Sequence, residues 1–340
     1  MPTRLSQLTS STQMRASHPG SRGGRTCPQS QLAGPRLALP SGMPEDPGLL
    51  EFALATARAA GVVLLDHFET ELAVATKSSD IDLVTPADRA AESAISSRIT
   101  AAYPDHWILA EESGRITGEA STDPRPPPGV LQWVVDPLDG TTNFAHRFPH
   151  FSVSIALVDH EGPRLGVVHD PTRDETFFAL RGRGAFLDSP RSRLRDGRPQ
   201  PLHTTSTRAL RLALVATGFA YTRATSPTNN LPEFNRVVPQ VRCIRRAGSA
   251  ALDLAYLAAG RLDAYWEYHL QPWDIAAGAL LVHEAGGLLT RIDGGPWDLR
   301  HGDLVAAGRN LHPVLQSELA TARQTHLSHG TCPEGHAARH

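Results

Sequence analysis

Two carboxylates at the end of an apolar segment form the sharpest chemical signal in the sequence. Asp136 and Asp139 stand three residues apart, directly after residues 132–135, which are largely apolar and β-branched and predict a buried strand. Gly140 lets a ligand approach the backbone closely, and Thr141 opens a predicted helical turn whose free N–H groups can receive an anion. This arrangement favours a metal-assisted phosphate site, although two acids in such a place also serve simply to cap a turn.

Three further acidic segments lie at expected element boundaries. Glu111 and Glu112 follow a short apolar strand predicted at 107–110, and Asp274 stands where a helix N-cap belongs. The segment 77–88 combines three acids with a lysine and hydroxyls at the start of a predicted helix. Each of these segments, taken alone, fits an ordinary solvated turn or a helix cap. None of them decides the function singly.

The composition limits the possible classes of protein. The chain has 340 residues, of which 40% are apolar, a formal net charge of −2 and a sequence pI of about 6.8. A sizeable core can be buried, and the charge balance does not favour nucleic acid or a membrane as a partner. Three widely spaced cysteines make no disulfide framework, which predicts a reducing, cytoplasmic location. The longest apolar run, 276–289, is interrupted by Gly278, His283 and Glu284, so no membrane span is predicted.

Apolar periodicity and turn residues divide the chain into helices and strands. Helices are predicted at 47–68, 86–103, 248–259 and 274–285. Strands are predicted at 107–110, 132–135, 152–158, 165–169, 175–180, 212–217, 262–267, 287–292 and 303–307. Short connections between the earlier strands favour an antiparallel sheet, and the later alternation favours a second sheet. The predicted fold class is therefore α/β (α+β), with helices layered on two sheets.

The two ends of the chain differ in composition from the middle. Residues 1–45 are basic, rich in Ser, Gly and Pro, and lack apolar periodicity, which predicts a disordered N-terminal extension; a transit peptide is the alternative. Residues 321–340 become polar and His-rich and are predicted to form a disordered tail. One catalytic domain is predicted at 46–320. Within it, the Gly-rich stretch 182–186 is predicted as a turn and the basic stretch 191–201 as a surface loop.

Four segments, in this order, resemble the signatures of the inositol monophosphatase family. They are 77–88, which begins Lys-Ser-Ser and ends Asp-Leu-Val-Thr-Pro-Ala-Asp; 110–114, Ala-Glu-Glu-Ser-Gly; 133–144, Trp-Val-Val-Asp-Pro-Leu-Asp-Gly-Thr-Thr-Asn-Phe; and 273–278, Trp-Asp-Ile-Ala-Ala-Gly. The signatures at 133–144 and 273–278 are highly specific, and the resemblance covers roughly residues 46–315. It implies a layered αβαβα sandwich of the sugar-phosphatase type and a homodimer.

The resemblance implies that the chain binds two to three Mg²⁺ ions, with Mn²⁺ as an alternative. The implied ligands are the side chains of Glu111, Asp136, Asp139 and Asp274 and the backbone carbonyl of Leu138. Electrostatics agree, because two carboxylates about 4 Å apart repel by about 4 kcal/mol at an effective dielectric constant of 20. A convergent cluster therefore needs cations or protons, and an all-oxygen set of ligands suits Mg²⁺ or Mn²⁺ better than Zn²⁺.

The resemblance also implies roles in catalysis and substrate binding. Asp88 and Thr141 would orient and deprotonate the attacking water, near an ion that Glu111 helps to hold. Direct attack by water is expected, since no Cys or His nucleophile stands in a phosphatase loop. The implied substrate residues are Lys77, Asp139, Gly140, Thr141, Gly248, Ser249, Ala250, Glu267 and Asp274.

The expected substrate is a small phosphate monoester of the inositol monophosphate type, which is a phosphorylated polyol or amino alcohol. Glu267 suits hydroxyl donors, but it also suits the amine of histidinol phosphate. Enzymes of this fold that act on histidinol phosphate, fructose 1,6-bisphosphate or nucleotides are therefore alternatives. The segment 269–272 touches the leaving alcohol in the family and departs from the family pattern here. A non-enzymatic alternative is a transcription-associated binding protein, which would not need the retained carboxylates.

Overall fold

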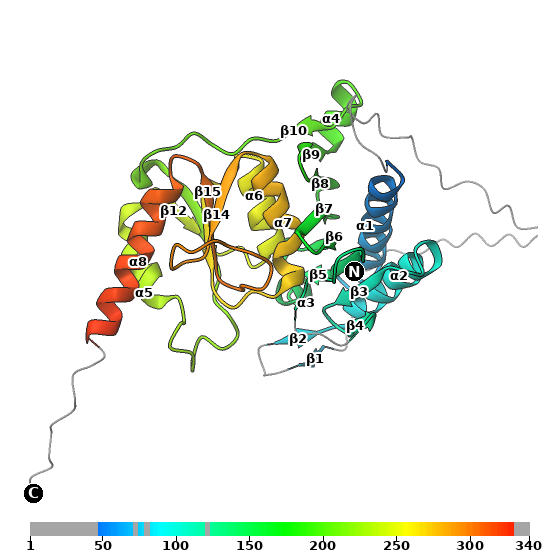
Figure 1. The fold of residues 1–340 in the computed structure, drawn as a ribbon, viewed down its shortest axis with the longest axis horizontal. Helices are drawn as coiled ribbons and strands as arrows, with labels where there is room; N and C mark the ends of the chain where they lie inside the picture. Colours follow the sequence, from blue (N-terminus) through cyan, green and yellow to red (C-terminus); the bar gives the residue numbers. More distant parts are fainter. Residues whose placement is uncertain (1–46, 71–73, 78–81, 120–122, 330–340) are drawn as a thin grey trace, which may run out of the picture. The chain divides into compact units, whose positions relative to one another are not determined.

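The structure is a computed structural model that describes residues 47–70, 74–77, 82–119 and 123–329. The extension predicted at 1–45 and the last part of the predicted tail, from 330 onward, lie outside the described residues. In the described part, two larger β-sheets and three groups of helices are arranged in layers (Figure 1).

Two N-terminal helices form the first layer. They are α1, Pro47–His67, and α2, Pro86–Ala102. Thr85 caps α2, because its side chain accepts from the N–H of Ala87 and its own N–H donates to Asp88 three residues later. Buried alanine and leucine side chains of α1 and buried alanine and isoleucine side chains of α2 share one core with the larger sheet, so this layer covers one face of it (Figure 1).

Among the described residues, α1 is long and apolar enough to cross a membrane, which corrects the expectation that no such segment exists. Half of its most apolar window is buried inside the protein. Leu50, Ala57 and Leu64 are at most 1% exposed and pack in the core beneath the larger sheet. The helix therefore has the burial of a core helix of a globular domain.

The larger sheet has eight strands in the order β10-β9-β8-β7-β6-β5-β3-β4. In chain order they are β3 Trp107–Ala110, β4 Gly114–Thr117, β5 Gln132–Asp139, β6 Ser152–Asp159, β7 Gly162–Asp170, β8 Glu175–Leu180, β9 Gly184–Asp188 and β10 Gln200–Pro201. Neighbouring strands run antiparallel, as predicted, except that β3 and β5 are parallel. A separate hairpin pairs β1, Ala75–Thr76, with β2, Leu83–Val84.

Two helices fill the space between the two sheets. They are α6, Ala250–Ala258, and α7, Pro272–Glu284, and their side chains share one core with both sheets (Figure 1). α7 lies close against β7 because position 166 is glycine: a Cβ there would stand 2.8 Å from the backbone of Ala277. A larger side chain at Gly166 would push α7, with Asp274 in its first turn, away from the larger sheet.

The smaller sheet has five strands in the order β12-β11-β13-β15-β14, parallel from β12 to β13 and antiparallel beyond. They are β11 Leu214–Thr217, β12 Cys243–Arg245, β13 Ala264–Glu267, β14 Gly287–Thr290 and β15 Leu304–Gly308. α5, Leu231–Val237, and α8, His312–His329, cover its outer face (Figure 1). Helices and sheets thus alternate through five layers, which confirms the predicted αβαβα sandwich.

The structure corrects two predictions about loops. The stretch 182–186 is not only a turn, because β9 begins at Gly184. The stretch 191–201, predicted as a surface loop, holds most of α4, Pro190–Arg195, and all of β10. α4 forms because Ser189 caps it through a capping box with Ser192. Only these two serines indicate the helix in the sequence.

The boundary predicted at 320 is also wrong, because α8 continues to His329. The helix keeps an apolar side on the smaller sheet: Leu315 and Leu319 are fully buried, and Ala322 beyond the boundary is 5% exposed. Three short elements remain among the described residues: the helix α3, Thr141–Ala145, and the 3-10 turns Leu210–Leu212 and Val238–Gln240. Polar composition hid the end of α8, because a helix packed on one side needs few apolar residues.

Candidate active site

A cleft of about 1110 Å³ opens where ends of β5, β11 and β13 meet the first turns of α3, α6 and α7. With one exception, the predicted site residues all line this cleft: Lys77, Glu111, Asp136, Leu138, Asp139, Gly140, Thr141, Gly248, Ser249, Ala250, Glu267 and Asp274. The exception is Asp88, which is fully buried behind Thr141. The fold therefore brings together residues that are up to two hundred positions apart in the sequence.

The end of β5 places the two acids of the central signature. All eight residues of β5 are buried, and its pairing with β6 shifts register between Asp136 and Asp139. The N–H of Leu138 donates to Asp136 Oδ1 at 2.9 Å, which closes the turn that the irregularity creates. Gly140 follows with φ 103°, and a Cβ there would stand 3.1 Å from the carbonyl oxygen of His150. Only glycine fits this position without strain.

Asp139 ties the end of β5 to the start of α6. Its Oδ2 accepts from the N–H of Ala251 at 2.8 Å and from the Ser249 hydroxyl, and its Oδ1 accepts from the N–H of Ala250 at 3.2 Å. Burial raises the pKa of Asp139 to about 6, although these hydrogen bonds act to lower it. The carboxylate therefore joins the acidic side of the cleft to the segment 248–250, which was predicted to bind the substrate alcohol.

The acids of the cleft are close enough to disturb one another. Burial, followed by the charges of Glu111, Asp139 and Asp274, raises the pKa of Asp136 well above its usual value. Burial and the charges of Glu111 and Asp139 raise the pKa of Asp274 in the same way. Asp274 Oδ2 also accepts from the N–H of Gln271 at 2.8 Å, so this residue closes the α7 capping box as well as facing the cleft. Such a cluster is stable only with protons or cations.

This cluster fits a hard divalent cation by its donors. The four acidic side chains offer only oxygen atoms as metal ligands. Leu138, whose backbone carbonyl was predicted as a further ligand, lines the same cleft. As they stand, no three His, Cys, Asp or Glu side chains in the described part of the chain are arranged to hold an ion. The charge of a bound divalent ion would offset the repulsion that raises the pKa values of these carboxylates.

The predicted pair of Asp88 and Thr141 is present. Thr141 Oγ1 donates to Asp88 Oδ1 at 2.9 Å, and Asp88 Oδ2 accepts from the N–H and the hydroxyl of Thr85 at 2.8 and 2.7 Å. Burial raises the pKa of Asp88, while the bonds from Thr85 and Thr141 oppose that shift. Asp88 is thus fixed by three donors and holds the Thr141 hydroxyl in one orientation at the cleft surface.

Lys77 reaches the same acids from the β1–β2 hairpin. Its Nζ stands 2.8 Å from Glu111 Oε1 and 2.5 Å from Glu112 Oε1. Glu112 was quoted in the signature but not predicted as a site residue, and burial raises its pKa to about 7. Its N–H donates to Glu92 at 2.8 Å, which anchors the end of β3 to α2. The structure therefore adds Glu112 to the acids near the predicted metal ligands.

The opposite side of the cleft contains the predicted Glu267 together with Gly218, Arg246 and Asp253, which the sequence did not single out. Glu267 accepts from the hydroxyl of Tyr265 at 2.5 Å, and burial raises its pKa to about 7 while the charge of Arg246 acts to lower it. Asp253, at the bottom of the cleft, has a pKa raised well above normal by burial and then by the charge of Glu267. Gly218 packs so tightly that a Cβ would stand 2.0 Å from the Glu267 carboxylate. Arg246 and Asp253 stand within five residues of the 248–250 segment, which is the signal that could have found them.

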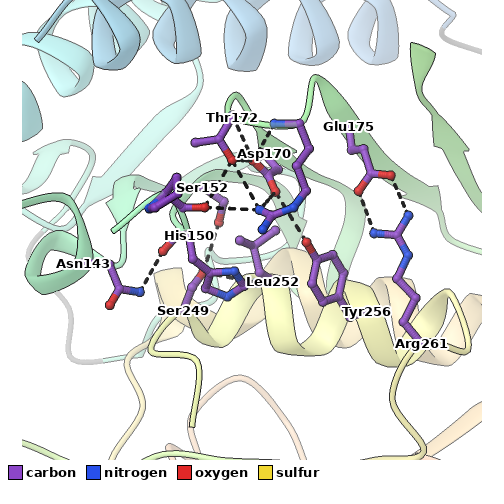
Figure 2. A network of polar contacts seen from close by, with 12 residues as sticks. Asn143, His150, Ser152, Asp170, Thr172, Glu175, Ser249, Leu252, Tyr256 and Arg261 are labelled. Carbon is purple, nitrogen blue, oxygen red and sulfur yellow. Dashed lines mark hydrogen bonds and ion pairs between the residues drawn. The ribbon is translucent and has the colours of Figure 1, made fainter. Parts of the chain in front are cut away.

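A polar network behind the cleft holds its two sides together (Figure 2). The side-chain amide of Asn143 donates to the carbonyl oxygens of His150 at 2.7 Å and Ala247 at 2.9 Å, which fixes α3 against the segment that leads into α6. Ser152 and Ser249 meet at 3.4 Å between their hydroxyls. These contacts hold the start of α3 and the start of α6 side by side at the cleft.

The same network continues along α6 to the larger sheet. Asp170 at the end of β7 holds Thr172 and Arg173 in the following turn and lies 3.5 Å from the hydroxyl of Tyr256 (Figure 2). Arg261, just after α6, makes two bonds of 2.6 Å to Glu175 at the start of β8. α6 is therefore attached to the larger sheet at its beginning and just beyond its end.

Comparison with known proteins identifies the family. Residues 47–328 match a sequence model of the inositol monophosphatase family. The chain belongs to this family, as its four signatures predicted. The family is generally metal-dependent, and its named relatives support phosphatase activity.

Individual relatives span almost the whole described chain. It is 40% identical to an inositol-1-monophosphatase of Synechocystis, covering 81% of this chain and 90% of that protein. It is 43% identical to a protein of Pseudomonas aeruginosa named Nus factor SuhB, covering 82% and 97%. Among solved structures, an inositol monophosphatase of Anabaena superposes with a TM-score of 0.68 at 38% identity, covering 80% and 95%. An IMPase of Thermotoga maritima superposes with a TM-score of 0.70 at 30% identity, covering 82% and 99%.

Proposed function

We propose that this protein hydrolyses a small phosphate monoester of the inositol monophosphate type, with Mg²⁺ as its metal and water as its nucleophile. The observation that carries this proposal is the meeting of four carboxylates with the Asp88–Thr141 pair in one cleft. Repelling acids demand cations, and a hydroxyl held by a buried carboxylate supplies a place for a water to lose its proton. Two to three ions, or Mn²⁺ in their place, fit the same ligands.

The ions would be held by four carboxylates and one backbone carbonyl, which belong to Glu111, Asp136, Asp139, Asp274 and Leu138. When bound, such ions neutralise the charge of a phosphate dianion and lower the pKa of water. The Thr141 hydroxyl donates a hydrogen bond to Asp88 and also lies 3.1 Å from the carbonyl oxygen of Leu138, which leaves its oxygen able to accept a hydrogen bond from a water in the cleft. The N–H groups of Gly140 and Thr141, at the start of α3, would receive the phosphate oxygens.

The alcohol side of the cleft supports a substrate with several hydroxyls or an amine. Glu267 and Asp253 accept hydrogen bonds from such groups, and Arg246 can contact an oxygen acceptor. Gly248, Ser249 and Ala250 border the path between this side and Asp139. Inositol monophosphate and histidinol phosphate both meet these requirements, so the two substrates are to be compared directly.

Release of inorganic phosphate from myo-inositol 1-phosphate and from histidinol phosphate tests the proposal, with Mg²⁺ and with EDTA. We expect release that requires Mg²⁺ and falls by about 10³-fold or more in Asp136→Asn, which removes a ligand and a charge. Asp105→Asn is the matched control, because Asp105 is exposed at the other end of β3 from Glu111. Unchanged release in EDTA, or full activity of Asp136→Asn, would contradict a metal-dependent mechanism at this site.

A second candidate function is that of a binding protein, as the relatives named Nus factor suggest. The two functions share one fold, and they differ in whether the acids of the cleft are needed. If binding is the function, association with a partner survives Asp136→Asn while phosphate release does not. We also propose the homodimer of the resemblance, which static light scattering on the full chain would test against a monomer.

A further inference from the structure

A second cavity lies beside the catalytic cleft. It has a volume of about 380 Å³ and lies between the loop before α5, the end of β13, the 291–303 loop and α8. Tyr268 and His269 line both cavities, so they form the wall between them. Arg291 and Arg323 come from the two segments on the far side of this wall. None of the predicted catalytic or substrate residues borders the second cavity.

Arg323 brings a second positive charge to this cavity. Its guanidinium stands 5.8 Å from the centre of the Tyr268 ring, and Nη1 lies 3.5 Å from the Tyr268 hydroxyl. Within the described residues, no ion pair joins Arg323 to a carboxylate; the Tyr268 hydroxyl donates instead to Glu233 at 2.7 Å. The side chain is thus held over an aromatic face with most of its donors left for another acceptor.

Arg291 is also incompletely satisfied. Its Nη2 pairs with Asp293 at 2.5 Å, and its Nη1 lies 3.4 Å from the ring of His301. Its Nε is buried and has no hydrogen-bond partner among the described residues. The Arg291 side chain is 33% exposed, and the residue lines the cavity. Two guanidinium groups facing one small cavity are a usual means of binding a tetrahedral oxyanion.

Two acids line this cavity, and the one that is not paired with Arg291 narrows the class of oxyanion: Asp293 pairs with Arg291, whereas Asp303 makes no such pair among the described residues. Asp303 lines it together with the two arginines, and an ionised carboxylate only accepts hydrogen bonds. A ligand beside it needs a donor as well as negative charge. Hydrogen phosphate has both, because one of its oxygens carries a proton, whereas sulfate at neutral pH has no proton to donate. Thr228 adds a hydroxyl to the same cavity.

We propose that this second cavity is a binding site for inorganic hydrogen phosphate, held by Arg291 and Arg323, with Asp303 accepting from the protonated oxygen. Tyr268 and His269 separate this site from the catalytic cleft. His269 has a left-handed backbone conformation, with φ 62°, and its Nε2 lies 2.7 Å from Thr228 Oγ1. Bound phosphate therefore contacts the segment that also borders the cleft. Phosphate is the product of the proposed reaction, but its binding here does not depend on that reaction.

Calorimetric titration of inorganic phosphate into the full chain at neutral pH, with EDTA present, tests the site without turnover. We expect saturable binding, weakened by about tenfold or more in Arg323→Gln and in Arg291→Gln, since each loses a charge-assisted contact. Arg323→Lys keeps the charge and is expected to retain part of the affinity. Asp303→Asn is expected to reduce the preference for phosphate over sulfate. Arg300→Gln is the matched control, because Arg300 is exposed and pairs only with the adjacent Asp298.

Three results would overturn the proposal. They are no uptake of phosphate by the wild type, equal uptake by wild type and Arg323→Gln, and loss of uptake on Arg246→Gln, which would place the phosphate in the catalytic cleft. Thermal unfolding followed by circular dichroism shows whether each variant is folded. If Arg291→Gln is unfolded, Arg323→Gln and Arg323→Lys still decide the question, because Arg323 lies on the accessible side of α8.

Discussion

The two sides of the catalytic cleft are built in different ways. On the acidic side, Asp136 to Thr141 stand within six consecutive residues, and buried partners such as Asp88 fix them. On the alcohol side, the residues come from four separate elements: Gly218 follows β11, Arg246 follows β12, Asp253 is in α6 and Glu267 ends β13. We propose that the chemistry centres on this turn, which Glu111 from the end of β3 and Asp274 from α7 complete, whereas substrate choice depends on how the smaller sheet positions distant segments.

This difference predicts separate kinetic effects. Changes on the acidic side should lower kcat, because they alter groups that act on the reacting atoms. Changes on the alcohol side should mainly raise KM, because they alter contacts with parts of the substrate that do not react. The following predictions test that separation, from the largest expected effect to the smallest.

Thr141→Val removes the hydroxyl that links Asp88 to the cleft while keeping the side-chain volume. We expect kcat to fall by about 10²- to 10⁴-fold, the usual range for a lost proton-transfer group, with KM little changed. Steady-state kinetics with myo-inositol 1-phosphate measure both parameters. Thr100→Val, at an exposed position on α2, is the control. An effect confined to KM would remove Thr141 from the proposed chemistry.

Gly218→Ala places a Cβ where the Glu267 carboxylate lies, at 2.0 Å. Glu267 must move, so KM for myo-inositol 1-phosphate should rise by roughly tenfold, the effect of one disturbed polar contact. Phenyl phosphate has no hydroxyl for Glu267 and serves as the control substrate. A similar rise in KM with both substrates would mean that Gly218→Ala also disturbs the acidic side. That result would contradict the proposed division of roles between the two sides of the cleft.

The free energy of unfolding in EDTA should fall as pH rises from about 4.5 to about 7. Burial raises the folded-state pKa of Glu267 to about 7 from the usual 4.5, so its contribution to stability is complete below 4.5 and is lost as pH passes the folded value. For this one group the fall is at most about 3 kcal/mol. Urea unfolding at several pH values measures it. In Glu267→Gln the free energy of unfolding should fall less with pH than in the wild type. An equal fall in both proteins would mean that the other acids cause the pH dependence.

Arg261→Gln tests the attachment of α6 to the larger sheet. It removes a bidentate contact to Glu175 and a guanidinium 4.8 Å from the Tyr256 ring centre. We expect a loss of about 1 kcal/mol in the free energy of unfolding, because the pair is partly exposed. Activity should not change. Arg300→Gln, at an exposed pair, should cost almost nothing, and a large loss of activity in Arg261→Gln would mean that α6 moves with the cleft.

Local signals predicted the acidic side well. The spacing of Asp136 and Asp139 and the glycine that follows them are properties of a short segment, and the resemblance added Asp88 and Thr141 as a pair, which the structure shows at 2.9 Å. The same kind of signal predicted most helices and strands of both sheets. The prediction of secondary structure was wrong at α4, where only two residues indicate the helix. It was also wrong at the end of α8, because a helix that packs on one side only can be mostly polar.

The resemblance implied Glu267 and the 248–250 segment on the alcohol side, but the other residues of that side and the second cavity follow from tertiary structure alone. Gly218 and Glu267 are 49 positions apart, and nothing in either segment shows that a Cβ at 218 would meet the carboxylate. Arg291 and Arg323 meet at one cavity only because α8 packs on the smaller sheet beside the 291–303 loop. The sequence by itself determined the family, the layered fold and the chemistry of the oxygen ligands, because turn geometry, apolar periodicity and residue type act over a few neighbours. Which side chains face each other across a cleft was decided only by the folded chain, because close approach between distant segments depends on the shape of both surfaces.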